Sequence, residues 1–357
     1  MKMTISRPIA FSEIGQKANQ EDALFPHPER VTAEQPVLVL CDGMGGHAHG
    51  ELASRCVADA VGRGVEGTEP VSVLQMKQRF SDALSEAYEA LDCMADAAPE
   101  ETKGEATMGT TLTFLARCTD GLLLAHIGDS RIYQFRPGCG VVFQTRDHSL
   151  VNELLAAGEL TEEEALTFPQ RNVITRAVQA HQTYPSKATT NVLTDVRPGD
   201  VFLLCCDGVV EQLDNADLER ILLAPRPLDE RLEALRQCCA ERHTRDNHTC
   251  WLFEVKKVSG VPPVDRSAEN DTADVKDQMQ PSRSASVPPS TSASASSDGG
   301  AHRPHVWLYV LCALLLAACF GAGYMLMHRK SAPVNGDSAP VQGTIHRPSH
   351  SSVSLRY

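Results

Sequence analysis

The sequence predicts an α+β fold for residues 1–258, and two patterns favour it. Short continuous apolar runs that end abruptly at Asp or Gly are typical of buried strands, and longer segments with apolar residues at every third or fourth position are typical of helices that bury one face. Several expected strands follow one another directly between residues 111 and 143. This succession argues against a doubly wound parallel sheet and favours a layered α+β architecture.

The expected elements follow from these patterns. In residues 73–94, apolar side chains repeat at intervals of three, four or seven, which places them on one face of a helix. Similar spacing predicts helices over 51–65, 150–157 and 228–240. The expected strands are the apolar runs at 37–41, 111–116, 122–127, 131–135, 201–206 and 251–255.

A flexible linker is expected over residues 259–305. Of the 17 residues from 281 to 297, eight are Ser and three are Pro, so this segment has too little apolar surface to offset the entropy lost on ordering. Residues 328–357 are also rich in Pro, Ser and Gly and predict a disordered tail. The folded domain is therefore expected to comprise residues 1–258.

Residues 306–327 predict a transmembrane helix. They form 22 residues without a charged side chain, about 33 Å of helix, which matches the hydrocarbon core of a bilayer. Trp307, Tyr309 and Tyr324 lie near its ends, where interfacial aromatic residues are common; a buried helix of a soluble core is the alternative. Because residues 1–10 lack a secretory signal pattern, we expect a single-pass protein of the inner or cell membrane with residues 1–258 in the cytoplasm.

The charge and the cysteine content argue against some classes of function. Residues 1–258 carry 25 basic and 39 acidic side chains, a net charge of −14. Such a surface repels a phosphate backbone, which argues against nucleic acid as a partner, and it attracts metal cations. The 12 cysteines lack the density and regular spacing of a disulfide scaffold, so we expect reduced and mostly buried thiols.

Five aspartates stand at the ends of apolar runs or in Gly-containing turns: Asp22, Asp42, Asp129, Asp207 and Asp246. A carboxylate at the tip of a buried strand is unfavourable unless it is paired or binds a metal. Oxygen ligands prefer Mg²⁺ or Mn²⁺ over zinc, and a glycine after Asp42 allows the backbone to turn sharply and offer a carbonyl to the same ion. Each Asp taken singly is more simply explained by an ordinary strand-to-loop turn.

Taken together, the motifs resemble those of the metal-dependent serine/threonine protein phosphatases of type 2C, in their bacterial form. The resemblance covers residues 8–256, and the motifs occur in the order found in that family. The matching stretches are residues 15–22, 41–47, 109–112, 128–131, 147–150, 171–177, 199–208 and 245–249.

The resemblance implies a fold, a site and an activity. The fold would be a central β-sandwich of two antiparallel sheets flanked by α-helices, four layers in all. Two Mn²⁺ or Mg²⁺ ions would be bridged by Asp42; Asp22 and the Gly43 carbonyl would hold one ion, and Asp207 and Asp246 the other. Asp129 would build a third, weaker metal site with Asp207.

By the same resemblance, a hydroxide bridging the two metal ions would attack phosphoserine or phosphothreonine in proteins. The enzyme would be a hydrolase that acts in signalling and opposes a cognate bacterial serine/threonine kinase. The expected partners are therefore phosphorylated proteins and that kinase, together with the membrane that binds the C-terminal helix.

The chain departs from the family pattern at three positions. Lys17 stands where many relatives have a phosphate-binding Arg, so it either binds phosphate as a point charge or simply lies on a loop. Met44 stands where some relatives have a His that acts as general acid. Cys206 stands where Ser is frequent, and we expect it to fill space, with redox sensitivity as the alternative.

Other residues are given simpler interpretations. His47 and His49 are expected to lie around the site or in solvent, and His126 is expected to be a core histidine with satisfied hydrogen bonds. Arg131 is expected to pair with a carboxylate. Residues 157–168 resemble the family's mobile flap, although three consecutive glutamates there, at 162–164, predict a solvated helix face.

Two other classes of function compete with a phosphatase. A catalytically silent phosphoprotein-binding membrane regulator could have the same fold, but it would be expected to have lost metal ligands, and none is missing here. A kinase or nucleotide-binding switch has no support, because the sequence contains neither a phosphate-binding Gly-x-x-x-x-Gly-Lys-Ser/Thr loop nor a kinase catalytic loop.

Overall fold

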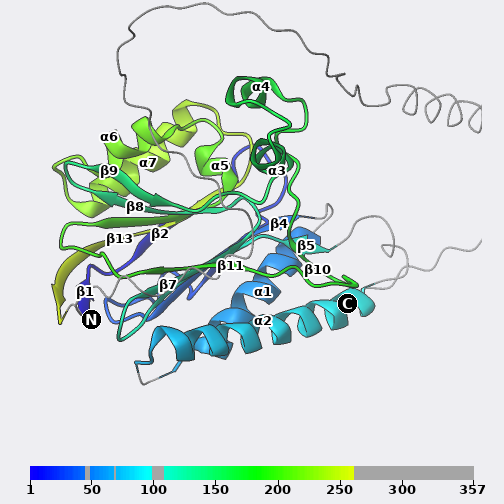
Figure 1. The fold of residues 1–357 in the computed structure, drawn as a ribbon, viewed down its shortest axis with the longest axis horizontal. Helices are drawn as coiled ribbons and strands as arrows, with labels where there is room; N and C mark the ends of the chain where they lie inside the picture. The colour runs from blue at the N-terminus through cyan, green and yellow to red at the C-terminus, as the bar shows by residue number, and fades with distance from the viewer. Residues whose placement is uncertain (45–48, 68–69, 99–107, 261–357) are drawn as a thin grey trace, which may run out of the picture. The chain divides into compact units, whose positions relative to one another are not determined.

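The computed structural model describes residues 1–44, 49–67, 70–98 and 108–260. These residues form two antiparallel sheets that pack face to face, with helices on both outer faces (Figure 1). The expected α+β sandwich with flanking helices is therefore confirmed. The residues predicted as linker beyond 260, transmembrane helix and tail lie outside the described part. Among the helices of the described part, none is long and apolar enough to cross a membrane.

The first sheet has six strands. Its order is β1 (Lys2–Ile5), β13 (His248–Ser259), β12 (Val201–Cys205), β8 (Arg131–Arg136) and β9 (Gly140–Gln144), and β2 (Ile9–Glu13) also pairs with β13. The second sheet has seven strands. Its order is β10 (Val178–Gln179), β5 (Gly109–Thr110), β4 (Val37–Met44), β6 (Leu112–Arg117), β7 (Leu122–Ile127) and β11 (Thr189–Leu193), and β3 (Asp22–Phe25) pairs with β4.

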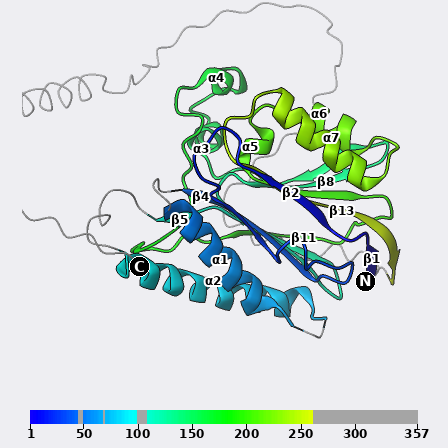
Figure 2. The same ribbon diagram turned by 180° about the vertical axis from the view of Figure 1, so that it is seen from behind.

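Two pairs of helices cover the sandwich. The second sheet is covered by α1 (His49–Val65) and α2 (Val73–Asp96), whose apolar faces share one core with it. The first sheet is covered by α6 (Asn215–Leu222) and α7 (Leu228–Glu241). Figure 2 shows the same layers from behind. The shorter helices α3 (Leu150–Ala157), α4 (Glu162–Thr167) and α5 (Asp207–Val210) connect the strands.

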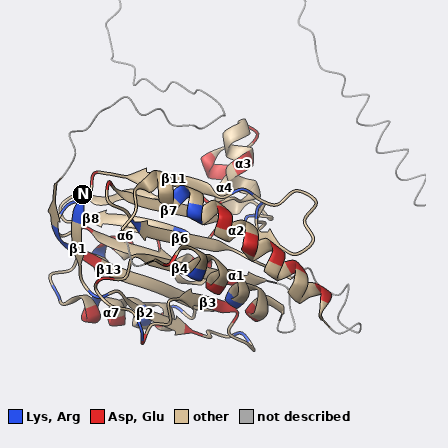
Figure 3. Ribbon diagram, turned by 90° about the horizontal axis from the view of Figure 1, so that it is seen from below, with Lys and Arg blue, Asp and Glu red and all other residues tan. Residues whose placement is uncertain are grey.

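The charges on α2 run against its dipole. In the ribbon of Figure 3, basic residues lie toward its start and acidic residues along the rest of its length, which agrees with Lys77 and Arg79 preceding Asp82, Glu86 and Asp92. Cations are unfavourable near a helix N-terminus and anions near a C-terminus. The helix is therefore stabilised by its buried face and by a capping box between Ser72 and Gln75.

Strand β4 explains why the two sheets pack face to face. Its side chains alternate, so Val37 and Val39 belong to the core under the helices, and Leu38 and Leu40 belong to the core between the sheets. The fully buried Trp251 of the first sheet crosses that interior and donates its indole N–H to the Val39 carbonyl oxygen, 3.1 Å away. The position of β4 is thus fixed from both sides.

The structure moves three predicted boundaries near the aspartates. Strand β4 continues to Met44, so Asp42 and Gly43 lie in a strand rather than in a turn. Strand β12 ends at Cys205, because Cys206 precedes the first turn of α5. Strand β13 begins at His248, three residues before the predicted start, and ends at Ser259.

Candidate metal centre

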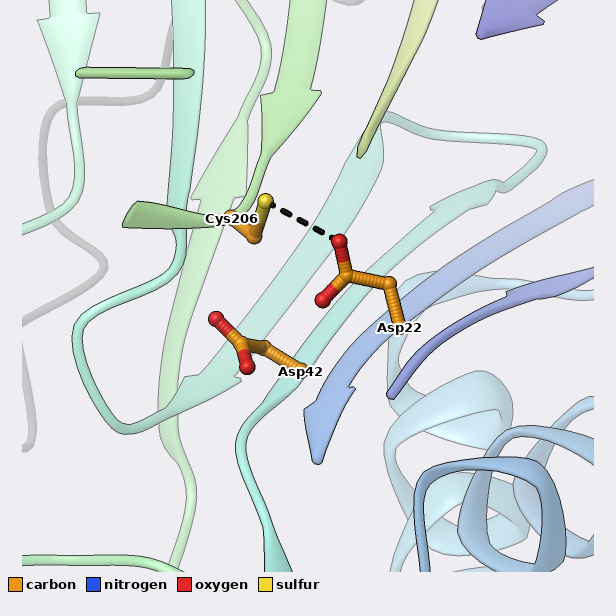
Figure 4. A group of neighbouring side chains, drawn as sticks. All are labelled: Asp22, Asp42 and Cys206. Atoms are coloured by element: carbon orange, nitrogen blue, oxygen red, sulfur yellow. Dashed lines mark hydrogen bonds between the residues drawn. The ribbon is translucent and has the colours of Figure 1, made fainter. Parts of the chain in front are cut away.

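Two carboxylates face each other at the ends of neighbouring strands. Asp22 begins β3 and is paired in register with Asp42 on β4. Figure 4 shows their carboxylates pointing into the same space. Asp22 is 5% exposed, and its Oδ1 has no hydrogen-bond partner. A buried carboxylate oxygen without a partner is unfavourable, so a cation bound to this atom would stabilise the site.

The electrostatics of the pair agree with that requirement. Burial raises the pKa of Asp22 to about 7, although contacts with Thr249 and Cys206 oppose the rise. Burial also raises the pKa of Asp42 well above its ordinary value, and the charges of Asp22 and Asp207 raise it further. Both groups therefore resist ionisation together unless a positive charge lies between them.

Close backbone packing holds the end of β4 in place. A Cβ on Gly43 would lie 2.1 Å from the Gly50 carbonyl oxygen, so only glycine fits here. The Asp42 peptide is held by two threonines: the Thr110 hydroxyl donates to its carbonyl oxygen at 2.8 Å, and its N–H donates to Thr111 Oγ1 at 3.0 Å. The matching stretch at 109–112 could have indicated these residues, but their role was not predicted.

Asp207 and Asp246 come from the other sheet. Asp207 is the first residue of α5, and Asp246 lies in the loop before β13. A Cβ on Gly208 would lie 2.0 Å from the Asn247 carbonyl oxygen, so the glycine lets α5 approach this loop. Burial raises the pKa of Asp207, and the neighbouring charge of Asp246 adds to the effect.

Asn247 joins the loop of Asp246 to the segment that leads into Asp22. Its Oδ1 accepts the N–H of Glu21 at 2.8 Å, and its Nδ2 donates to the carbonyl oxygens of Ile14 and Asn19. Sequence reasoning missed this residue because its partners lie more than 220 positions away in the chain. It fixes the relative position of two predicted ligands.

Asp129 reaches the same region from the turn after β7. Burial raises its pKa to about 7, and the charge of Asp207 raises it further. Arg131 follows two residues later but forms a two-point ion pair with Asp147, at 2.7 and 2.8 Å. The expectation that Arg131 pairs with a carboxylate is thus confirmed, and its charge only partly offsets the rise in the pKa of Asp129.

A cleft of about 560 Å³ connects most of these groups. Its described lining includes Asp42, Gly43, Asp129, Asp207 and Asp246, so the structure brings together five of the six predicted metal-binding residues. The sixth, Asp22, is absent from the lining and is the register partner of Asp42 on the neighbouring strand. The remaining lining residues are Lys17, Ala18, Asn19, Glu21, Met44, Thr111, Asn172 and Ile174.

Lys17 forms an ion pair with one of the predicted ligands. Its Nζ lies 2.8 Å from Asp246 Oδ1, and both side chains are partly exposed. Burial lowers the pKa of Lys17, but the contact with Asp246 and the charges of Glu21 and Asp42 raise it above its ordinary value. Lys17 is therefore protonated, and it is the one basic side chain in the described lining of the cleft.

Cys206 lies closer to the carboxylates than expected. Its sulfur and one oxygen each of Asp22 and Asp42 all lie within 4.8 Å of one another (Figure 4). The interpretation of Cys206 as a space-filling residue is therefore incomplete, because its sulfur is a possible ligand.

The histidines contribute little to this site. His47 lies outside the described residues, and His49 is buried at the start of α1. His126 is buried as expected, with Nε2 2.9 Å from the Arg146 carbonyl oxygen, but its Nδ1 has no hydrogen-bond partner, so the prediction of a fully satisfied histidine was wrong. The three glutamates at 162–164 are exposed on α4, as predicted.

The residues fit a pair of small divalent cations. Apart from Cys206, the donor set consists of carboxylate and carbonyl oxygens, which hard cations such as Mn²⁺ and Mg²⁺ prefer. The unpartnered Asp22 Oδ1 and the upward pKa shifts of four aspartates both indicate that bound cations would stabilise this site.

Comparisons with known proteins agree with this site. A family model for protein phosphatase 2C matches residues 11–252. Protein phosphatase PhpP of Streptococcus pneumoniae is 33% identical over 248 residues, which are 69% of this chain and 96% of that protein. The crystal structure of the serine/threonine phosphatase PstP/Ppp of Mycobacterium tuberculosis matches with a TM-score of 0.60 and 31% identity, covering 71% of this chain and 100% of that one.

A second solved structure bears on the metals. It is the catalytic domain of PstP in complex with two manganese ions, and it matches with a TM-score of 0.55 and 29% identity over 71% of this chain and 99% of that one. With the family model covering most of the described domain, the chain belongs to the protein phosphatase 2C family of metal-dependent protein phosphatases.

Proposed function

We propose that this chain hydrolyses phosphoserine and phosphothreonine in proteins at the cleft that contains Asp42. The observation that carries the proposal is the convergence of five aspartates from both sheets, four in the lining of the cleft and Asp22 paired with Asp42. Lys17 is the one basic side chain of the described lining. When bound, two Mn²⁺ or Mg²⁺ ions supply the positive charge that activates water and neutralises the phosphoryl oxygens.

Each aspartate has an assigned place in this proposal. Asp42 would bridge the two ions, because its carboxylate interacts with the charges of both Asp22 and Asp207. Asp22 and the Gly43 carbonyl would hold one ion, and Asp207 and Asp246 would hold the other. Asp129 with Asp207 would form a third, weaker site, which agrees with the effect of the Asp207 charge on the pKa of Asp129.

Lys17 is proposed to position the phosphate. Its ammonium group lines the cleft beside Asp246, so a phosphoryl group entering the cleft would compete for it. An ammonium group binds phosphate as a point charge, without the two-point geometry of an arginine. Thr110 and Thr111 act indirectly, because they orient the Asp42 backbone.

The location and partners of the enzyme are also part of the proposal. We propose that residues 306–327 anchor the chain in the inner or cell membrane, that residues 259–305 act as a tether, and that the catalytic domain lies in the cytoplasm. The apolar run and the Ser/Pro-rich composition support this. The expected partners are membrane-proximal phosphoproteins and a kinase that phosphorylates them.

The activity is tested with the full-length protein, Mn²⁺ and a phosphothreonine peptide. We expect phosphate release that chelation abolishes and that Asp42→Asn and Asp207→Asn each reduce by at least about a hundredfold. Asp59→Asn, a charged position on α1 paired with Arg63, is the matched control and should remain active. Undiminished release in both site variants would contradict the proposal, and binding of the peptide without turnover would favour a silent regulator.

Removing the membrane segment tests the location. We expect a chain cut near residue 301 to hydrolyse soluble peptides as the full-length chain does, but to dephosphorylate a membrane-anchored substrate more slowly, because the tether no longer raises its local concentration. Equal rates on both substrates would exclude the tether.

A further inference from the structure

Cys206 occupies a buried position with contacts suited to a metal ligand. It is fully buried, and its sulfur lies 3.3 Å from Asp22 Oδ2 and 3.4 Å from the Asn247 carbonyl oxygen, to either of which the thiol can donate. The Thr249 N–H donates to the same sulfur at 3.1 Å. A backbone N–H directed at sulfur is the kind of outer contact that orients a thiolate ligand and stabilises its charge.

The carboxylates supply an independent observation that points to a ligand. Asp22 is 5% exposed, and its Oδ1 has no hydrogen-bond partner. In Figure 4 the carboxylates of Asp22 and Asp42 and the sulfur of Cys206 surround one space, and their ligand atoms lie within 4.8 Å of one another.

We infer that Cys206 adds a sulfur ligand to the Asp22–Asp42 pair, so that this position takes a thiophilic divalent cation, Cd²⁺ or Zn²⁺, in competition with Mn²⁺ or Mg²⁺. On binding, the thiol proton passes to solvent and the sulfur forms a bond to the ion, while Asp22 Oδ2 exchanges its hydrogen bond for a bond to the same ion. A hard ion leaves the thiol protonated and uses the oxygens alone.

The spacing of the atoms fits this exchange. A zinc ion about 2.3 Å from sulfur and about 2.0 Å from oxygen in tetrahedral geometry separates the two ligands by roughly 3.5 Å. The observed separation of Cys206 Sγ and Asp22 Oδ2 is 3.3 Å. The ion therefore replaces the shared proton with little movement of either side chain.

The consequence is a phosphatase that is sensitive to soft metals at its own catalytic site. A serine in place of Cys206 keeps the size and the hydrogen bonds of the side chain but lacks the sulfur. The variant should therefore lose the preference for thiophilic cations. This inference rests on the proposed role of Asp22 and Asp42 as ligands of the catalytic ions.

The test is a Cd²⁺ titration of the full-length protein, read by sulfur-to-cadmium charge-transfer absorbance and by calorimetry. We expect Cys206→Ser to remove one saturable component of the absorbance and to weaken Cd²⁺ binding at the Mn²⁺-competitive site by about ten- to a hundredfold. Cys118→Ser removes a comparably buried thiol near the end of the second sheet. This variant should retain the full absorbance change and the wild-type affinity for Cd²⁺. Cys206→Ala repeats the test should the serine hydroxyl itself bind the ion.

A measurement of Mn²⁺ binding distinguishes a failure of this inference from a failure of the proposed function. If wild-type protein binds Mn²⁺ and Cd²⁺ displaces it equally well from the wild type and from Cys206→Ser, the inference is wrong and the proposed function stands. If the absorbance change is lost equally in Cys118→Ser, the signal comes from thiols in general, and the inference is again overturned. If the wild type fails to bind Mn²⁺ at all, the proposed function itself fails.

Discussion

Asp22 and Asp42 lie directly opposite each other across β3 and β4, as a register pair of two carboxylates. Like charges at such a position destabilise a sheet, and burial increases the effect. The strand ends nevertheless keep this register, with the Gly43 N–H donating to the Glu21 carbonyl oxygen at 3.1 Å. The pair is therefore unfavourable in the metal-free fold and favourable only with a cation.

Replacing one of the pair should stabilise the metal-free protein. We expect Asp42→Asn to raise the free energy of unfolding in the presence of a chelator by up to about 1 kcal/mol, because it removes one of two facing charges. The same variant should lose the stabilisation that Mn²⁺ gives the wild type. Thermal unfolding with chelator and with Mn²⁺ measures both effects, and a destabilised metal-free variant would indicate that the carboxylate has a structural partner.

The free energy of unfolding of the metal-free protein should depend on pH, because Asp22 and Asp129 have higher pKa values in the folded state than in the unfolded state. The pKa of Asp22 rises from 3.8 to about 7 on folding, and Asp129 shifts in the same way. Between these values the folded state binds more protons than the unfolded state, so the free energy of unfolding of the metal-free protein should fall as pH rises from about 4 to about 7.

Mn²⁺ competes with those protons, so its apparent affinity should increase over the same interval. Denaturant unfolding at about pH 5 and about pH 7.5, with and without Mn²⁺, checks both trends. A Mn²⁺ affinity that is flat over this range would mean that Asp22 is already ionised in the folded protein.

Lys17 should affect metal and phosphate in opposite directions. Removing its charge with Lys17→Gln frees Asp246 and should tighten Mn²⁺ binding by about three- to tenfold, while weakening product inhibition by inorganic phosphate. Lys17→Arg keeps the charge and should behave as wild type toward Mn²⁺. Calorimetry for Mn²⁺ and inhibition constants for phosphate provide the readouts; parallel weakening of both would show that Lys17 only maintains the loop.

Gly208 should matter through the distance between two ligands. A methyl group in Gly208→Ala would meet the Asn247 carbonyl oxygen and push α5 away from the loop of Asp246. We expect Mn²⁺ affinity to fall by about ten- to a hundredfold. Gly67→Ala is the control, because its Cβ would meet only the end of the Arg79 side chain. Unchanged affinity in Gly208→Ala would show that the loop yields without moving Asp246.

Much of the fold follows from local sequence patterns. The expected strands and helices are present because their apolar residues were periodic or continuous, as in β4, β7 and α2. Strands such as β11 were missed because they are short, polar and only partly buried, and their pairing with β7 depends on distant residues. Helix α5 was missed because four residues carry no helical period.

The site could be predicted only in part, for a related reason. The aspartates were identifiable because each follows an apolar run or a glycine turn, and Arg131 because it lies beside them. The ion pair of Lys17 with Asp246 and the contact of Cys206 with Asp22 join segments about 184 to 229 residues apart. No local pattern encodes such contacts, so they appear only once both sheets are assembled.

The most direct test of the account is an anomalous difference map from crystals of the full-length protein grown with Mn²⁺. The account predicts two manganese peaks bridged by the Asp42 carboxylate, one also bound by Asp22 and the other by Asp207 and Asp246. Manganese found elsewhere, or no peak within coordination distance of Asp42, would contradict it.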